Sequence, residues 1–130
     1  MGIRIRKDEL ISLIGKTETF RNPKIDLEQY CIDASSAVDI VFFAGIEFDD
    51  IRNKILLDLG AGTGRLSITS AFLQAKAVIS VDIDPQAIQI LKYNIQNLNL
   101  SHIVNPLVAD MQHLEFSKGF LQTTPITTLM

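Results

Sequence analysis

An unbroken aliphatic segment that runs into three closely spaced glycines constrains this chain more than any other feature. Residues 55–59 read Ile-Leu-Leu-Asp-Leu, and residues 60–64 read Gly-Ala-Gly-Thr-Gly. A buried strand that turns sharply into a helix accounts for this order, since glycine allows the turn and lets the backbone approach a ligand closely. The N–H groups at the start of the helix would point at that ligand. We therefore expect a strand, a tight turn and a helix that together bind a nucleotide-like molecule.

The positions around the glycines exclude two common nucleotide sites. A dinucleotide fingerprint counted from Gly60 needs a glycine at its sixth position, where this chain has Arg65. A Walker loop ends in Gly-Lys followed by Ser or Thr, and no such tripeptide closes this turn. An acidic residue, Asp58, instead precedes the first glycine by two positions. The pattern is Asp-x-Gly-x-Gly-x-Gly, and it leaves open the alternative of a turn without any ligand.

Helices and strands alternate on both sides of this turn. The spacing of apolar residues predicts helices at 7–15, ending at Gly15, and from Asp33 or Ser35 to about residue 48. Beyond the turn we expect a helix to about residue 74, a strand at 77–82 and a helix from Pro85 to about residue 97. A third strand follows at 104–108 and is expected to be broken early by Pro106. The start of a fourth strand is expected at 125–130. Alternation of this kind implies a parallel sheet with right-handed crossovers.

Aspartates follow two of the expected strands. Asp82 ends the second strand, and Asp110 follows the third. Ligands of an open parallel sheet bind beyond the carboxyl ends of its strands, so both carboxylates are expected at one site. An ionised carboxylate only accepts hydrogen bonds, which suits the ribose hydroxyls for Asp82 and an adenine amino group for Asp110. Helix capping is the alternative for any single aspartate, and it accounts for Asp84.

Four segments carry a family resemblance. They are Leu-Glu-Gln-Tyr at 27–30, the strand and glycine turn at 55–64, Val-Asp-Ile-Asp-Pro at 81–85, and Ala-Asp-Met at 109–111. Together they resemble the class I S-adenosylmethionine-dependent methyltransferases and, within them, the archaeal and eukaryotic rRNA adenine-N6 methyltransferases. The resemblance covers roughly residues 7–111 and implies an α/β, Rossmann-like fold, a parallel sheet with helices on both faces, and S-adenosylmethionine as cofactor. The cofactor contacts that it implies are Gln29, Tyr30, Asp58, Gly60, Gly62, Thr63, Asp82, Asp110 and Met111.

The chain departs from that family in three places. Cys31 and Ile32 stand where the family usually has Pro-Thr, and Thr63 stands at a position that is often Cys. The Asn-Pro-Pro-Phe motif, which aligns an exocyclic amine and stacks on the flipped base, is absent from the sequence. We therefore expect a domain truncated before its catalytic loop, with C-terminal strands missing, no catalytic residue present and no activity alone. Residues 1–54 would form a helical segment with a cofactor-closing loop, and 55–130 the cofactor-binding front half.

Charge and composition limit the kinds of ligand, partner and cellular environment that we expect for this chain. Residues 1–24 hold six basic and three acidic side chains, and the remainder holds six basic and twelve acidic ones. A basic arm of this kind either steers an RNA backbone or forms an ordinary solvated helix face. The single cysteine, Cys31, excludes an internal disulfide framework and a cysteine-based zinc site, and we expect no metal. No apolar run is long enough to cross a bilayer, so we expect a cytoplasmic protein without membrane contact.

The resemblance also supplies substrate and partner. It implies RNA as the substrate, specifically adenine N6 in rRNA, and it allows a small activator subunit. A protein-glutamine methyltransferase, which also requires the Asn-Pro-Pro motif, is the alternative among enzymes, and the Leu-Glu-Gln-Tyr segment and the basic arm argue against it. From a different class, the chain fits a cofactor-binding module without activity, and a nicotinamide enzyme is the third option.

Overall fold

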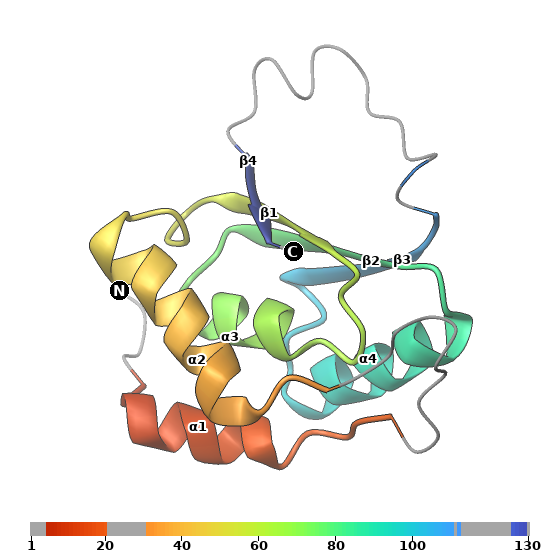
Figure 1. Cartoon of the computed structure of the whole chain (residues 1–130), viewed down its shortest axis with the longest axis horizontal. Helices are drawn as coiled ribbons and strands as arrows, with labels where there is room; N and C mark the ends of the chain where they lie inside the picture. Colours follow the sequence, from red (N-terminus) through yellow and green to blue (C-terminus); the bar gives the residue numbers. More distant parts are fainter. Residues whose placement is uncertain (1–4, 21–30, 111, 113–125, 130) are drawn as a thin grey trace.

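The computed structural model describes residues 5–20, 31–110, 112 and 126–129, and for 126–129 it describes the backbone alone. Figure 1 shows the strands as one layer and the helices as a second layer packed against it. In chain order the elements are α1 (Lys7–Gly15), α2 (Ala34–Phe42), the π-helix η2 (Phe43–Glu47), β1 (Ile55–Leu59), α3 (Arg65–Phe72), β2 (Ala77–Asp82), α4 (Pro85–Asn97), β3 (Val104–Val108) and β4 (Ile126–Leu129).

The four strands form a parallel sheet in the order β3-β2-β1-β4. Leu57 of β1 pairs with Ile79 of β2, and Val81 of β2 pairs with Leu107 of β3. The interior strands β1 and β2 are rich in aliphatic residues because parallel strands are commonly buried on both faces. The expected parallel, Rossmann-like sheet is therefore confirmed, and β4 confirms the start of a fourth strand.

The helices of the described residues cover one face of the sheet, whereas the resemblance implied helices on both faces (Figure 1). The chain passes from β1 through α3 to β2, then through α4 to β3, and so moves in one direction across the sheet. Right-handed crossovers that proceed in one direction place their helices on the same side. α1 and α2 join that layer, because α2 contacts α3 and α1 contacts both. Helices on the opposite face, which the resemblance implied, are not among the described residues.

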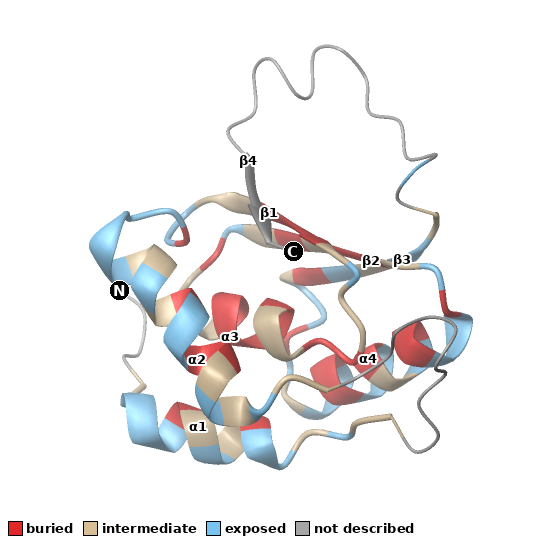
Figure 2. Ribbon diagram, viewed as in Figure 1, coloured by how far each residue is buried: buried red, intermediate tan, exposed pale blue. Residues whose placement is uncertain are grey.

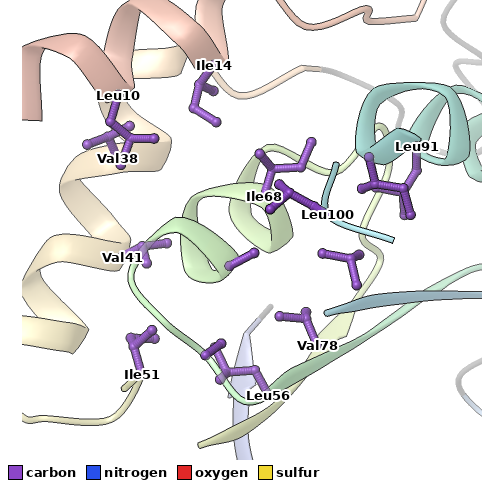
Figure 3. Packing of buried hydrophobic residues seen from close by; sticks show 14 of the residues in the cluster. Leu10, Ile14, Val38, Val41, Ile51, Leu56, Ile68, Val78, Leu91 and Leu100 are labelled. Carbon is purple, nitrogen blue, oxygen red and sulfur yellow. The ribbon is translucent and has the colours of Figure 1, made fainter. Parts of the chain in front are cut away.

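A single apolar core joins the N-terminal helices to the sheet. Leu10 of α1 and Val38 and Val41 of α2 are fully buried, and the same cluster continues to Leu56 of β1 and Ile68 of α3. Figure 3 shows these side chains converging between the helices and the strands, and Figure 2 shows α3 as a largely buried helix. Burial of each such side chain contributes about 1.5–3 kcal/mol. Residues on both sides of position 54 thus share one core.

Two helix starts follow the expected capping chemistry. Asp33 caps α2, since its Oδ1 accepts a hydrogen bond from Ser36 N at 2.7 Å. Asp84 caps α4 in the same way, with Gln86 N donating to its Oδ1 at 3.0 Å. Pro85 occupies the first turn of α4, where its missing N–H is not needed.

α1 spans Lys7–Gly15 as expected, and Lys16 takes the cap position in right-handed backbone. Two other helix boundaries differ from the expectations. The helix expected to reach residue 48 changes to π geometry at Phe43. α3 begins at Arg65 and ends at Phe72, slightly inside its expected limits.

Pro106 lies inside β3 and does not break it. β3 is an edge strand of the described sheet. Ile103 O accepts from Val78 N at 2.9 Å, and Ala109 N donates to Asp82 O at 3.0 Å. The backbone groups of odd-numbered β3 residues therefore face β2. Pro106 turns its nitrogen toward the open edge, where the ladder needs no donor, and the expected break was wrong for that reason.

Candidate cofactor site

The turn between β1 and α3 places all three of its glycines in left-handed backbone. The φ angle is +72° at Gly60, +59° at Gly62 and +100° at Gly64, values that residues with a side chain rarely adopt. A Cβ on Gly64 would clash with Leu91 Cδ1, so α4 packs against the turn at that position. A Cβ on Gly60 would meet no atom within 4 Å. The predicted tight turn is therefore present, packed at Gly64 and open at Gly60.

Asp82 lies at the carboxyl end of β2 and joins this turn to the start of α4. Its Oδ2 accepts a hydrogen bond from Gly62 N at 2.9 Å, and its Oδ1 accepts one from Asp84 N at 2.9 Å. The residue is half-buried. Each carboxylate oxygen can accept two hydrogen bonds, so these two contacts leave acceptor capacity on both oxygens.

Asp58 takes a different position from the other predicted carboxylates. It is 1% exposed, and it lies on the face of β1 that packs against α3. Ser67 of α3 donates its hydroxyl to Asp58 Oδ2 at 2.5 Å, and Ser80 of β2 lies 2.7 Å from the same Ser67 hydroxyl. The side chain therefore holds the start of α3 against the sheet and is sealed from the open side of the glycine turn.

Burial controls the charge of Asp58. It raises the pKa of this carboxyl to about 7, because an ionised carboxylate loses its hydration inside the protein. The hydrogen bond from the Ser67 hydroxyl opposes the shift, and repulsion from Asp82 adds to it. Burial prevails, so the Asp58 carboxyl holds a proton over much of the range below pH 7.

The other predicted contacts are only partly described. Asp110 is half-buried just beyond β3, and its Oδ1 accepts from Gln112 N at 3.0 Å. Since β2 and β3 are parallel, Asp110 and Asp82 follow the same edge of the sheet, as predicted. Gln29, Tyr30 and Met111 lie outside the described residues.

Two polar residues whose roles were not predicted from the sequence lie beside the turn or at the start of the helix that follows it. Asn94 of α4 is 2% exposed and donates from Nδ2 to the carbonyl oxygen of Thr63 at 3.0 Å. Thr63 itself is 4% exposed, so it joins the turn through its backbone. Arg65 donates from Nη1 to the carbonyl oxygen of Ile32 at 3.0 Å. A signal for Asn94 was available, because it follows Leu91 by three residues and so falls on the apolar stripe of its helix.

The described residues contain neither a group of side chains that could hold a metal ion nor a helix that could cross a membrane. Among these residues, no three His, Cys, Asp or Glu side chains are grouped closely enough to hold a metal ion. No helix in this part of the chain has both the length and the apolar character needed to cross a membrane.

Comparison with known proteins identifies a family to which most of the chain matches, and several similar proteins. A family model described as ribosomal protein L11 methyltransferase (PrmA) matches residues 31–118. An uncharacterised protein of Methanocaldococcus jannaschii, MJ0284, is 45% identical over 96 residues, covering 74% of this chain and 42% of that protein. The rRNA N(6)-adenosine-methyltransferase METTL5 of Danio rerio is 39% identical over 95 residues, covering 73% of this chain and 46% of the relative.

A solved structure shares the fold. PH1948 of Pyrococcus horikoshii, which carries a provisional assignment as an RNA methyltransferase, superposes with a TM-score of 0.77 at 34% identity. The match covers 85% of this chain and 55% of that one. The chain thus spans about half the length of the relatives that it matches.

Proposed function

Since the chain belongs to the class I S-adenosylmethionine-dependent methyltransferases, with a PrmA-type domain at residues 31–118, we propose that it binds this cofactor at the glycine turn and serves the methylation of RNA. S-adenosylmethionine is the cofactor of this family. What we propose concerns three further points: which residues bind this cofactor, what the substrate is, and which partners take part.

The position of the Asp82 carboxylate beside the glycine turn carries the proposal. Gly62 N and Asp84 N hold its two oxygens, which fixes the carboxylate at the carboxyl edge of the sheet. The remaining acceptor capacity suits two neighbouring ribose hydroxyls. The open side of Gly60 allows the cofactor to approach the backbone there. These features fit a nucleoside-containing cofactor.

The remaining contacts extend from this point. Asp110, one strand further along the same edge, is proposed to accept from the adenine amino group, and Thr63 to contribute its backbone. Gln29, Tyr30 and Met111 remain contacts proposed from the family resemblance. Asp58 is proposed to support the turn from beneath, because its side chain is buried against Ser67.

Positioning is the chemistry that these residues supply. When bound, S-adenosylmethionine provides an electrophilic methyl group on a sulfonium sulfur, and direct in-line transfer needs no covalent enzyme intermediate. The turn and Asp82 hold and orient the nucleoside, and a closed site excludes water from the acceptor. No described residue is assigned a proton-transfer role.

The proposed substrate is ribosomal RNA, with adenine N6 as the acceptor. The relatives support it, since METTL5 of Danio rerio is named an rRNA N(6)-adenosine-methyltransferase. Two residues of the basic arm already have acidic partners, because Arg6 pairs with Glu9 at 2.9 Å and Lys7 pairs with Asp39 at 2.6 Å. The proposal also includes a small activator subunit and a cytoplasmic location, which co-purification from cells and cell fractionation would test.

Calorimetric titration with S-adenosylmethionine tests the site. Asp82→Ala removes the proposed ribose acceptor and is expected to weaken binding by about 1.5–3 kcal/mol, the usual value for a hydrogen bond to a charged group. Asp8→Ala, at an exposed position of α1, is the matched control and should bind as the parent does. Equal affinity of Asp82→Ala and the parent chain would refute the assignment of Asp82.

Mass spectrometry of ribosomal RNA from cells with and without the gene tests the substrate. Loss of N6-methyladenosine at one position on deletion would support the proposal. Unchanged RNA together with a methyl group lost from a glutamine of a protein would refute it and favour the protein-glutamine alternative.

A further inference from the structure

A buried amide on α4 connects the glycine turn to the N-terminal part of the chain. Asn94 Oδ1 accepts a hydrogen bond from Glu18 N at 2.9 Å. Its Nδ2 donates to Glu18 O at 3.0 Å and to Thr63 O at 3.0 Å. The amide thus uses both of its hydrogens and its oxygen, on two segments that are far apart in the sequence. A buried polar network that is fully satisfied in this way restricts its members to one arrangement.

The residues next to Glu18 contact the turn and the start of α3. A Cβ on Gly62 would lie 3.5 Å from the ring of Phe20, so this ring covers the side of Gly62. Arg65, the first residue of α3, reaches back to Thr17 Oγ1 at 3.4 Å. Residues 17–20 therefore form a wall against the glycine turn, and we call them the N-terminal wall.

The turn needs such support because its own sequence specifies its shape poorly. Glycine adopts positive and negative φ about equally well, so three glycines within five residues allow many conformations when free. A ligand that selects one of them loses affinity by the entropy of ordering the rest. The bond from Asn94 to the Thr63 carbonyl fixes the peptide plane in the middle of the turn.

We infer that Asn94 is a positioning residue for the cofactor, which holds the glycine turn and the N-terminal wall in the binding arrangement without touching the ligand itself. The inference rests on the proposed function for its ligand and goes beyond it in its mechanism. Asn94 acts from the far side of the turn, through the Thr63 carbonyl and through the backbone of Glu18. A turn that is held in its binding arrangement in advance binds the cofactor with higher affinity, although Asn94 adds no contact to the cofactor.

Asn94→Asp separates this role from a purely structural one. An aspartate keeps at most one donor, so at least one of the two carbonyl oxygens loses its partner. Affinity for S-adenosylmethionine, measured by calorimetry below the unfolding transition, is expected to fall about tenfold or more. Asn97→Asp makes the same change at an exposed position of the same helix and should leave affinity unchanged. A purely structural role would lower the unfolding temperature and leave the affinity of the folded protein as it was.

A second variant and a ligand-free measurement keep the inference testable if Asn94→Asp folds poorly. Phe20→Leu changes a partly exposed ring beside Gly62 and is expected to weaken binding about threefold. Amide NMR signals of Gly62 to Gly64 without ligand should broaden or shift in Asn94→Asp and stay in place in Asn97→Asp. Parental affinity in both Asn94→Asp and Phe20→Leu would overturn the inference while the proposed function stands. A parent chain that binds no S-adenosylmethionine would overturn the proposed function, and unchanged turn signals in Asn94→Asp would then overturn the positioning role as well.

Discussion

Replacing Asp58 by Asn tests whether this buried carboxyl is protonated in the folded protein near neutral pH. Asn has nearly the same shape, keeps an oxygen that can accept from Ser67, and carries no charge at any pH. The parent side chain is 1% exposed, and burial raises its pKa from 3.8 to about 7. Folded and unfolded protein therefore bind this proton with different affinity, which makes stability depend on pH.

The sign and the size follow from that shift. Because the pKa in the folded protein is the higher one, the stability linked to this proton is fully present below about pH 4 and is lost as pH rises through about 7. A shift of this size corresponds to about 4 kcal/mol at most, at 1.36 kcal/mol per pH unit. The two donor groups of Ser67 act in the opposite direction, since they favour the ionised form. The raised pKa means that burial destabilises the ionised carboxylate more than the hydroxyl and backbone N–H of Ser67 stabilise it.

Urea unfolding between pH 5 and 8 measures the effect. The free energy of unfolding of the parent, minus that of Asp58→Asn, should fall by about 2.5 kcal/mol over this range, with most of the change below pH 7. Taking the difference cancels the other titrating groups, which both proteins share. Asp8→Asn, at an exposed position, is the control and should give a difference that varies little with pH. A flat difference for Asp58→Asn would refute the reasoning, because it would mean that the carboxyl is ionised throughout this range and that the donors of Ser67 offset its burial.

Two other substitutions test how the turn and α4 are built. Gly64→Ala is expected to destabilise the fold by at least about 1–3 kcal/mol in urea unfolding, because its Cβ would meet Leu91 Cδ1 and its φ is +100°; parental stability would contradict the described packing. Asp84→Ala removes the cap of α4 and is expected to cost about 1 kcal/mol, up to about 2, in the same assay, whereas an unchanged midpoint would mean that Pro85 alone suffices to start the helix.

Local chemistry made much of the fold predictable from the sequence. The aliphatic runs of β1 and β2 have one plausible environment, the interior of a parallel sheet. Asp84 followed by Pro85 marks a helix start through a side-chain acceptor and a preset φ, and the structure has both in those roles. These features act within a few residues, so no knowledge of the tertiary structure is needed to read them.

Features that depend on direction were harder to predict. Pro106 was expected to break its strand, because a proline removes a donor, but whether that donor is needed depends on which side of β3 faces β2. The placement of helices on one face follows from the strand order, which a single chain pattern does not reveal. The orientation of Asp58 could have been predicted from the sequence, since alternation along a strand puts its side chain on the same face as the core residue Leu56.

Asp58 and Asn94 together explain how a glycine-rich turn acquires one shape. Asp58 accepts from Ser67 and so fixes the helix that follows the turn, while Asn94 donates to Thr63 and fixes the turn itself. Both are polar residues on otherwise apolar faces, and each would be expensive to bury without its partners. Their burial is stable only when the turn and α3 are in place, so the cost of a misplaced turn is an unsatisfied polar group in the core. The rigidity that a cofactor site needs is thus supplied by the residues beneath the turn, and the glycines supply only the freedom to adopt it.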